Sequence, residues 1–209
     1  MSLGIKTIVN RYVCPLASLP TFDSLMSNNE ATARDIKATA RTAGEEISRR
    51  AEWQAMYKST TAGAGTSSIA VPDDFHRLIQ GNAVHLSGNP WTPLPYIRAA
   101  DVWSFVKELP SAQPYFSVKQ NTILFLPALT ASVLIRYISK NWAVNGSTEI
   151  DELTSDDDVP LFSPQLVGLG ILFRYKRAKG LAYQDLADEF EARLEAEINA
   201  FAAFLAGDL

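Results

Sequence analysis

The stretch "SDDDVPLFSPQLVGLGILFRYKRAKG", residues 155–180, decides how the fold is interpreted. Three consecutive acids come first, then an apolar run that opens with Ser-Pro, then a basic segment that ends at glycine. Ser163 is a favoured N-cap residue, and Pro164 suits the first helical position, where no hydrogen-bonded amide is lost. Gly180 can adopt the left-handed conformation that often ends a helix. The stretch therefore predicts a helix from about residue 163 to residue 180.

The apolar side chains of this helix cover nearly its whole circumference, which predicts that other elements surround it. They are Leu166, Val167, Leu169, Ile171, Leu172 and Phe173. A membrane-spanning helix needs about 20 apolar residues, and this run is far shorter. We therefore expect a central core helix with a basic C-terminal end, and no membrane segment.

The three acids, Asp156, Asp157 and Asp158, suggest two interpretations. A calcium loop spaces its ligands at alternate positions and needs a glycine for the bend, and neither feature is present. The other interpretation is a solvated acidic loop, whose charge is favourable near the N-terminus of the following helix. We expect the solvated loop and no metal.

A second helix is predicted from about Tyr183 to Leu205, because apolar residues recur at steps of three and four. Its opposite face is acidic and carries Asp185, Asp188, Glu189, Glu191, Glu195 and Glu197. No charge occurs from Ala200 to Gly207, and Phe201, Phe204 and Leu205 cannot all lie on one narrow stripe. Burial of each such side chain is worth about 1.5–3 kcal/mol, so we expect this turn to dock on a partner. The alternative is a tail that folds back on its own domain.

The rest of the chain divides into a helical N-terminal part and a β-rich middle. Residues 29–58 predict a helix whose stripe of mostly small residues lets a neighbouring helix approach closely, and a short helix is expected after Pro20. Residues 59–68 predict a flexible polar connector, and branched and aromatic runs then predict strands, with Gln120 and Asn121 at a hairpin tip. A short helix is expected at 99–109. The prediction is an α+β fold with a helical part at 1–60, an antiparallel β-rich insertion at 61–158 and a C-terminal helical pair at 159–209.

Composition narrows the classes of function. The 209 residues are 47% hydrophobic and 20% charged, and the net charge of −4 does not favour a protein that wraps nucleic acid. The apolar N-terminus is interrupted by Asn10 and Arg11, so we expect no cleaved signal peptide. Cys14 lies in no nucleophile motif, and only two histidines, His76 and His85, are present. We expect neither an enzyme nor a bound cofactor.

The order of the features resembles that of the adaptor proteins of tailed-bacteriophage necks, also called head-completion or connector proteins. The resemblance is carried by "RRAEWQAMYK", a Thr/Ser-rich connector, "VPDDF", "LIRYISKNW", "SDDDVP", "PQLVGLGILFRYKRAKGLAY" and a final acidic helix, from about residue 29 to residue 197. It implies a structural virion protein, made in the host cytoplasm, that forms a ring of twelve beneath the portal once DNA is packaged. DNA would pass through the ring without sequence-specific binding, and the next neck or tail protein would dock on it.

The resemblance also implies roles for particular residues. Phe201, Phe204 and Leu205 become candidates for portal contact, whereas Trp53, Phe75 and Trp142 are expected in the core. The basic end of the central helix and the acidic face of the last helix could pair within one chain or between neighbours around the ring. The candidates for such contacts between subunits are Arg174, Lys176, Arg177, Glu189, Glu191 and Glu195.

Three alternatives remain at this point. The first is another neck or tail component, such as a stopper or tail-completion protein. The second is a β module on a helical stalk that binds carbohydrate or a host surface, which predicts exposed aromatic side chains at Trp91, Tyr96 and Trp103. The third is an enzyme, which predicts a cleft that brings His76 or His85 together with carboxylates.

Overall fold

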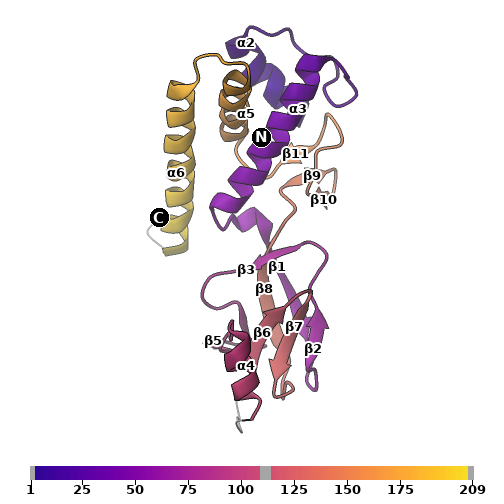
Figure 1. Ribbon diagram of the computed structural model, residues 1–209, viewed down its shortest axis with the longest axis vertical. Helices are drawn as coiled ribbons and strands as arrows, with labels where there is room; N and C mark the ends of the chain where they lie inside the picture. The colour runs from indigo at the N-terminus through magenta and orange to yellow at the C-terminus, as the bar shows by residue number, and fades with distance from the viewer. Residues whose placement is uncertain (1–2, 109–113, 207–209) are drawn as a thin grey trace. The chain divides into compact units, whose positions relative to one another are not determined.

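The computed structural model describes residues 3–108 and 114–206 of the chain, and for residues 90, 91 and 201–206 it describes the backbone alone (Figure 1). Contacts divide the chain into two compact units. The helical unit comprises Met1–Met56 and Asn141–Leu209, and the β unit comprises Tyr57–Lys140. Residues 141–158, which we expected in the β-rich part, group with the helices instead. The α+β prediction, with a β-rich segment inserted between packed helices, is confirmed.

The helical unit contains a helical N-terminal stretch, three longer elements and a small sheet. Its elements are α1 (Ile5–Ile8), the π-helix η1 (Val9–Val13), α2 (Cys14–Ala17), α3 (Ala31–Arg50), η2 (Gln54–Met56), β9 (Ala143–Asn145), β10 (Thr148–Ile150), β11 (Val159–Pro160), α5 (Pro164–Ala178) and α6 (Gln184–Ala206). Strands β10, β9 and β11 pair in that order. Figure 1 shows α5 between α3 and α6, and α5 contacts both helices.

Helix α5 is the central core helix that the sequence predicts. The Ser163 hydroxyl accepts a hydrogen bond from the Leu166 amide at 3.2 Å, Pro164 is the first helical residue, and Gly180 has a φ of +67°. Leu166, Val167, Ile171 and Leu172, which lie on different sides of the helix, are all fully buried. The residues that begin and end the helix, and the burial of its apolar run, therefore both agree with the prediction.

Small residues let α3 approach its neighbours closely. A Cβ at Gly44 would lie 2.3 Å from the indole of Trp142, and a Cβ at Gly170 would lie 3.2 Å from the Cβ of Ala43. Trp142 is buried, as expected for a core residue, and Trp53 packs on Phe162 with ring centroids 5.1 Å apart. The small-residue stripe on α3 is confirmed as a packing face.

Helix α3 is shorter than the predicted helix. It ends at Arg50, and Ala51 is extended with a φ of −147°. The Trp53 indole N–H then donates to the Ile47 carbonyl at 2.7 Å, which supplies a partner for a carbonyl that the ended helix leaves unpaired. The expected extension of the helix to residue 58 is wrong, because the chain leaves α3 at Ala51 and enters strand β1 at Tyr57.

The region around Pro20 also differs from the prediction. Helical structure lies before it, at Ile5–Ala17, where Pro15 supplies no N–H and the preceding turn is a π-helix. Residues 19–30 form no helix. The Asn10 side chain donates to the Phe22 carbonyl at 2.9 Å and accepts from the Phe22 amide at 2.8 Å, so a side chain 12 residues away shapes this loop.

The acidic loop is not simply solvated, which corrects another expectation. Asp158 is completely buried and accepts hydrogen bonds from the Thr154 and Ser155 amides. The Asp156 carboxylate accepts from the Leu25 and Met26 amides at 2.9 and 2.7 Å, and the Asp156 carbonyl accepts from the Lys6 amide. The loop therefore fastens the N-terminal segments to the rest of the helical unit.

The β unit consists of two antiparallel sheets and one short helix. Its elements are β1 (Tyr57–Ala62), β2 (Ser68–Ala70), β3 (Phe75–Leu78), β4 (Val84–Leu86), β5 (Asn89–Pro93), α4 (Ala100–Val106), β6 (Tyr115–Lys119), β7 (Thr122–Leu126) and β8 (Val133–Ser139). One sheet has the order β1-β8-β4-β5, with β3 also on β8, and the other has the order β2-β7-β6. The predicted hairpin tip at Gln120 and Asn121 is confirmed.

Strand β1 corrects the expected flexible connector. Residues 57–62 pair in register with β8, from Tyr57 opposite Ile138 to Ala62 opposite Val133. The stretch contains Thr60 and Thr61, whose branched side chains suit a strand. Only the residues between Ala62 and Ser68 lie outside the two strands.

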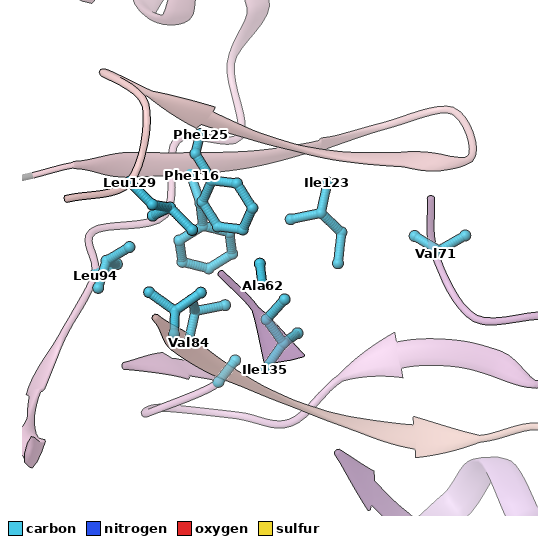
Figure 2. Packing of buried hydrophobic residues seen from close by; sticks show 11 residues of the cluster. Ala62, Val71, Val84, Leu94, Phe116, Ile123, Phe125, Leu129 and Ile135 are labelled. Atoms are coloured by element: carbon cyan, nitrogen blue, oxygen red, sulfur yellow. The ribbon is translucent and has the colours of Figure 1, made fainter. Parts of the chain in front are cut away.

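The core of the β unit lies between its two sheets (Figure 2). Phe116 and Phe125 are opposite each other on β6 and β7, and both are buried with Leu129 and Ile135. Phe75 is partly buried against this cluster and lies 5.6 Å from the Tyr137 ring. Each fully buried side chain of this kind contributes about 1.5–3 kcal/mol, so the β unit has a core of its own.

Candidate partner-binding surfaces

Arg174, a candidate for contact with a neighbouring subunit, already has partners in its own chain. Its side chain is 4% exposed. The guanidinium donates to the Gly170 carbonyl at 2.7 Å and to the Glu46 carboxylate, and it lies 4.2 Å from the Phe173 ring centroid. Burial lowers the pKa of Arg174, and the Glu46 carboxylate opposes that shift. These contacts make Arg174 part of the α3–α5 packing.

Glu191 is the second candidate with a partner in the chain. Its carboxylate pairs with the guanidinium of Arg50 at the end of α3. Both side chains are about half exposed, at 50% and 42%, so the pair adds little to stability. It nevertheless fixes Glu191 beside α3.

The other charged candidates lie on the surface of the helical unit. Glu189 and Glu195 are exposed on α6 and form no ion pair with a described residue. Arg177 is exposed with its guanidinium 6.0 Å from the Phe173 ring centroid, and Lys176 is half-buried. Within the described part of the chain, these four residues remain available for a partner.

A shallow hollow lies where α2 and the α5–α6 turn meet. It has a volume of about 410 Å³ and is lined by Leu16, Lys176, Ala182, Tyr183, Gln184, Asp185 and Leu186. Leu16 is 58% exposed, and Leu181 in the turn is 51% exposed. Sequence reasoning missed this apolar surface, although the isolated Leu181 directly after the helix-ending Gly180 was a signal for it.

The last turn of α6 contains the predicted portal-contact residues. The backbone is helical through Ala206, but the side chains of Phe201, Phe204 and Leu205 lie outside the described part of the structure. Upstream on α6, Phe190 and Leu194 are buried, which confirms the apolar stripe there. The docking and fold-back alternatives for the final turn both stay open.

The two units differ strongly in charge. The β unit carries seven Lys and Arg against four Asp and Glu, whereas the helical unit carries twelve against nineteen. Their formal net charges are therefore +3 and −7. The acidic residues of α6 contribute to the negative charge of the helical unit.

Cys14, His76 and His85 are the residues on which the enzyme alternative depends. His85 is buried, and desolvation together with Arg136 lowers its pKa, so the ring stays neutral. His76 is exposed and lines a groove whose described lining contains no Asp or Glu. Burial raises the pKa of the Cys14 thiol, which disfavours the thiolate that a nucleophile requires.

The described residues contain neither a candidate membrane span nor a candidate metal cluster. Among the described helices, none is both long and apolar enough to span a membrane. No group of three or more His, Cys, Asp or Glu residues in the described ranges is placed to hold a metal ion.

Residues 16–207 match the SU10 adaptor protein family. The chain belongs to this family. The match includes both units, so the adaptor assignment applies to most of the chain and implies a structural role in a phage particle. The resemblance to neck adaptors that the sequence suggests is thereby confirmed. No curated protein matches the chain.

Family membership changes how the surfaces are interpreted. An adaptor binds other virion proteins, so exposed apolar and charged surfaces are candidate interfaces. The aromatic residues on which the surface-binding alternative depends differ in their exposure. Tyr96 is 43% exposed, Trp103 is half-buried, and the Trp91 side chain lies outside the described residues.

Proposed function

We propose that this adaptor is a structural protein of the virion neck, in which copies of the chain form a ring beneath the portal. The observation that carries the proposal is the family match over residues 16–207. The ring extends the channel through which packaged DNA passes, without sequence-specific binding, and offers a platform for the next neck or tail protein. A stopper-like or tail-completion role is the alternative, and a ring bound directly to the portal distinguishes the two.

The portal contact is assigned to Phe201, Phe204 and Leu205 in the last turn of α6. This assignment is supported by the uncharged run from Ala200 to Gly207, which is exceptional in an otherwise acidic helix. The backbone is helical through Ala206, so Phe201, Phe204 and Leu205 fall within one short helical segment of the chain. A cluster of aromatic side chains at such a position is typical of a small interface core.

Co-sedimentation with purified portal tests this contact. We expect Phe204→Ser to reduce the amount of chain that sediments with the portal by about tenfold or more, because a buried aromatic anchor is lost. Ala203→Ser is the control, since it introduces the same residue in the same turn without removing an aromatic ring, and it should leave association unchanged. Removal of residues 200–209 should abolish it. Unchanged association of both Phe204→Ser and the truncated chain would contradict the assigned contact.

Contacts between neighbouring copies are assigned to Lys176 and Arg177 on one chain and Glu189 and Glu195 on the next. The four side chains have no ion-pair partner among the described residues, whereas Arg174 and Glu191 are occupied within the chain. Opposite charges near the end of α5 and along α6 suit a head-to-tail interface, which generates a closed ring when the rotation between copies permits it. Such contacts set orientation more than affinity.

A further inference from the structure

The β unit contains a groove that the proposed ring and portal contacts do not use. It has a volume of about 790 Å³ and lies between β3 with its following loop, the segment 93–98 and strand β6. The apolar lining residues are Phe75, Leu78, Ile79, Ala83, Leu94, Phe116 and Val118, together with Pro93 and Pro95. Both β3 and β6 are at the edges of their sheets, so the groove follows an opening between the two sheets.

The outer edge of β6 is only half paired. The Phe116 amide donates to the Pro95 carbonyl at 3.0 Å, and the Ile97 amide donates to the Phe116 carbonyl at 2.9 Å. Alternate residues of a strand direct their backbone groups to the same side, so the Val118 N–H and C=O also face away from β7. Within the described ranges, neither group has a backbone partner on that side. The segment 93–98 thus leaves an open stretch of strand edge beside the groove.

The groove also has a definite chemical character. Tyr96 is stacked on Phe116 with ring centroids 5.0 Å apart, and it is 43% exposed. The exposed Arg98 has its guanidinium 6.0 Å from the Tyr96 ring centroid and forms no ion pair with a described residue. Arg77 lines the groove as well, and no carboxylate does so in the described lining. An apolar surface next to a cation favours an apolar segment that carries a carboxylate.

We propose that this groove binds an extended segment of another polypeptide, which adds a strand to the open edge of β6. Its backbone pairs with the Val118 N–H and C=O, its apolar side chains alternate into the groove, and one Asp or Glu lies against Arg98. This is the binding mode known as β-augmentation, in which main-chain hydrogen bonds give affinity and side-chain pockets give specificity. The inference depends neither on the ring nor on the portal contact.

The test uses the full chain and two synthetic peptides, each acetylated, amidated and fluorescently labelled. Both alternate Val with Thr or Ser, and they differ only in a central Asp or Lys. We expect the Asp peptide to bind, measured by fluorescence anisotropy, and to slow hydrogen exchange of the Val118 amide. The Lys peptide should bind about tenfold more weakly, because it places a cation beside Arg98.

Two variants separate the two parts of the site. Val118→Pro removes the outward-facing N–H without removing a β6–β7 hydrogen bond, and it should weaken binding of the Asp peptide about tenfold. Val118→Thr keeps the N–H and is its matched control. Arg98→Glu should reverse the preference between the two peptides. Circular dichroism establishes that each variant is folded.

The proposal is overturned if the Asp peptide does not bind, if the two peptides bind the wild-type chain equally, or if Val118→Pro and Val118→Thr bind alike. A peptide with a sequence taken from this chain would also overturn the proposal if it bound as tightly as the Asp peptide and if Arg98→Glu did not change its affinity. Loss of portal association in Phe204→Ser would leave peptide binding unchanged, so the two proposals fail separately.

Discussion

Gly44 shows how one missing Cβ positions a buried tryptophan. The indole of Trp142 lies on the backbone of α3 at this residue, and a Cβ would come within 2.3 Å of the ring. Trp142 is 1% exposed, so the ring has little room to move away. The close approach offsets the low helix propensity of glycine at a mid-helix position.

Gly44→Ala should therefore destabilise the helical unit. Alanine gains about 1 kcal/mol in helix propensity, but overpacking against Trp142 should cost more, for a net loss of about 1–3 kcal/mol in the free energy of unfolding. Urea denaturation followed by tryptophan fluorescence measures it. Thr42→Ala, at an exposed position on the same helix, should change stability by less than about 0.5 kcal/mol. Equal midpoints for Gly44→Ala and wild type would contradict the packing argument.

At the scale of elements, the acidic loop links segments that are far apart in the sequence. Its Asp156 carboxylate holds the Leu25 and Met26 amides, which lie 131 and 130 residues earlier in the chain. Burial alone would raise the pKa of Asp156, but hydrogen bonds from Met26, Ser24 and Leu25 and the charge of Lys6 lower it below its usual value. The ionised carboxylate is therefore the form that stabilises the loop.

Asp156→Asn should reduce the free energy of unfolding by about 1–3 kcal/mol at pH 7, because hydrogen bonds to a charged acceptor are weakened. A carboxyl group with a lowered pKa stabilises the fold above its unfolded pKa, and this contribution is lost as pH falls through the folded pKa. The difference between wild type and Asp156→Asn should thus shrink below about pH 4. Asp157→Asn, at the exposed neighbour, is the control and should match wild type. A difference that is independent of pH would count against this account.

Elements whose signals are local could be predicted from the sequence. Helix α5 shows this best, since Ser163, Pro164 and Gly180 define its ends without any distant contact. Helix α6 and the hairpin at Gln120 and Asn121 were predictable for the same reason. The loop at 19–30 and the acidic loop were not, because each is shaped by residues far away in the sequence.

The same limit applies to the candidate surfaces. The sequence identified a basic end and an acidic face, but it could not show that Glu46 occupies Arg174 or that Arg50 occupies Glu191. Those partners are on α3, more than 100 residues earlier. The exposed edge of β6 likewise depends on where the segment 93–98 pairs, which no local pattern indicates.

At the scale of the whole molecule, charge is distributed unevenly between the two units. The helical unit has a net charge of −7 and the β unit a net charge of +3. Uneven charge of this kind steers the orientation in which proteins meet, and its effect weakens as the salt concentration rises. The proposed contact between Lys176 and Arg177 on one chain and Glu189 and Glu195 on the next joins two helical units, so it depends on the local charges of α5 and α6 and not on this difference.

Charge reversal separates a contact between copies from one within the chain. The double variant Lys176→Glu and Arg177→Glu should reduce ring formation on the portal, and so should Glu189→Lys with Glu195→Lys. Combining all four substitutions should restore it, because opposite charges again face each other. Reversal of Lys107, the residue that follows α4 and lies outside the proposed interface, is the control and should have no effect.

The most direct measurement is the mass of the complex that the wild-type chain forms with purified portal, determined by native mass spectrometry. We expect one discrete complex with a full ring of the chain, one copy for each portal subunit. A portal that binds no copies, or a few copies without closing a ring, would contradict it.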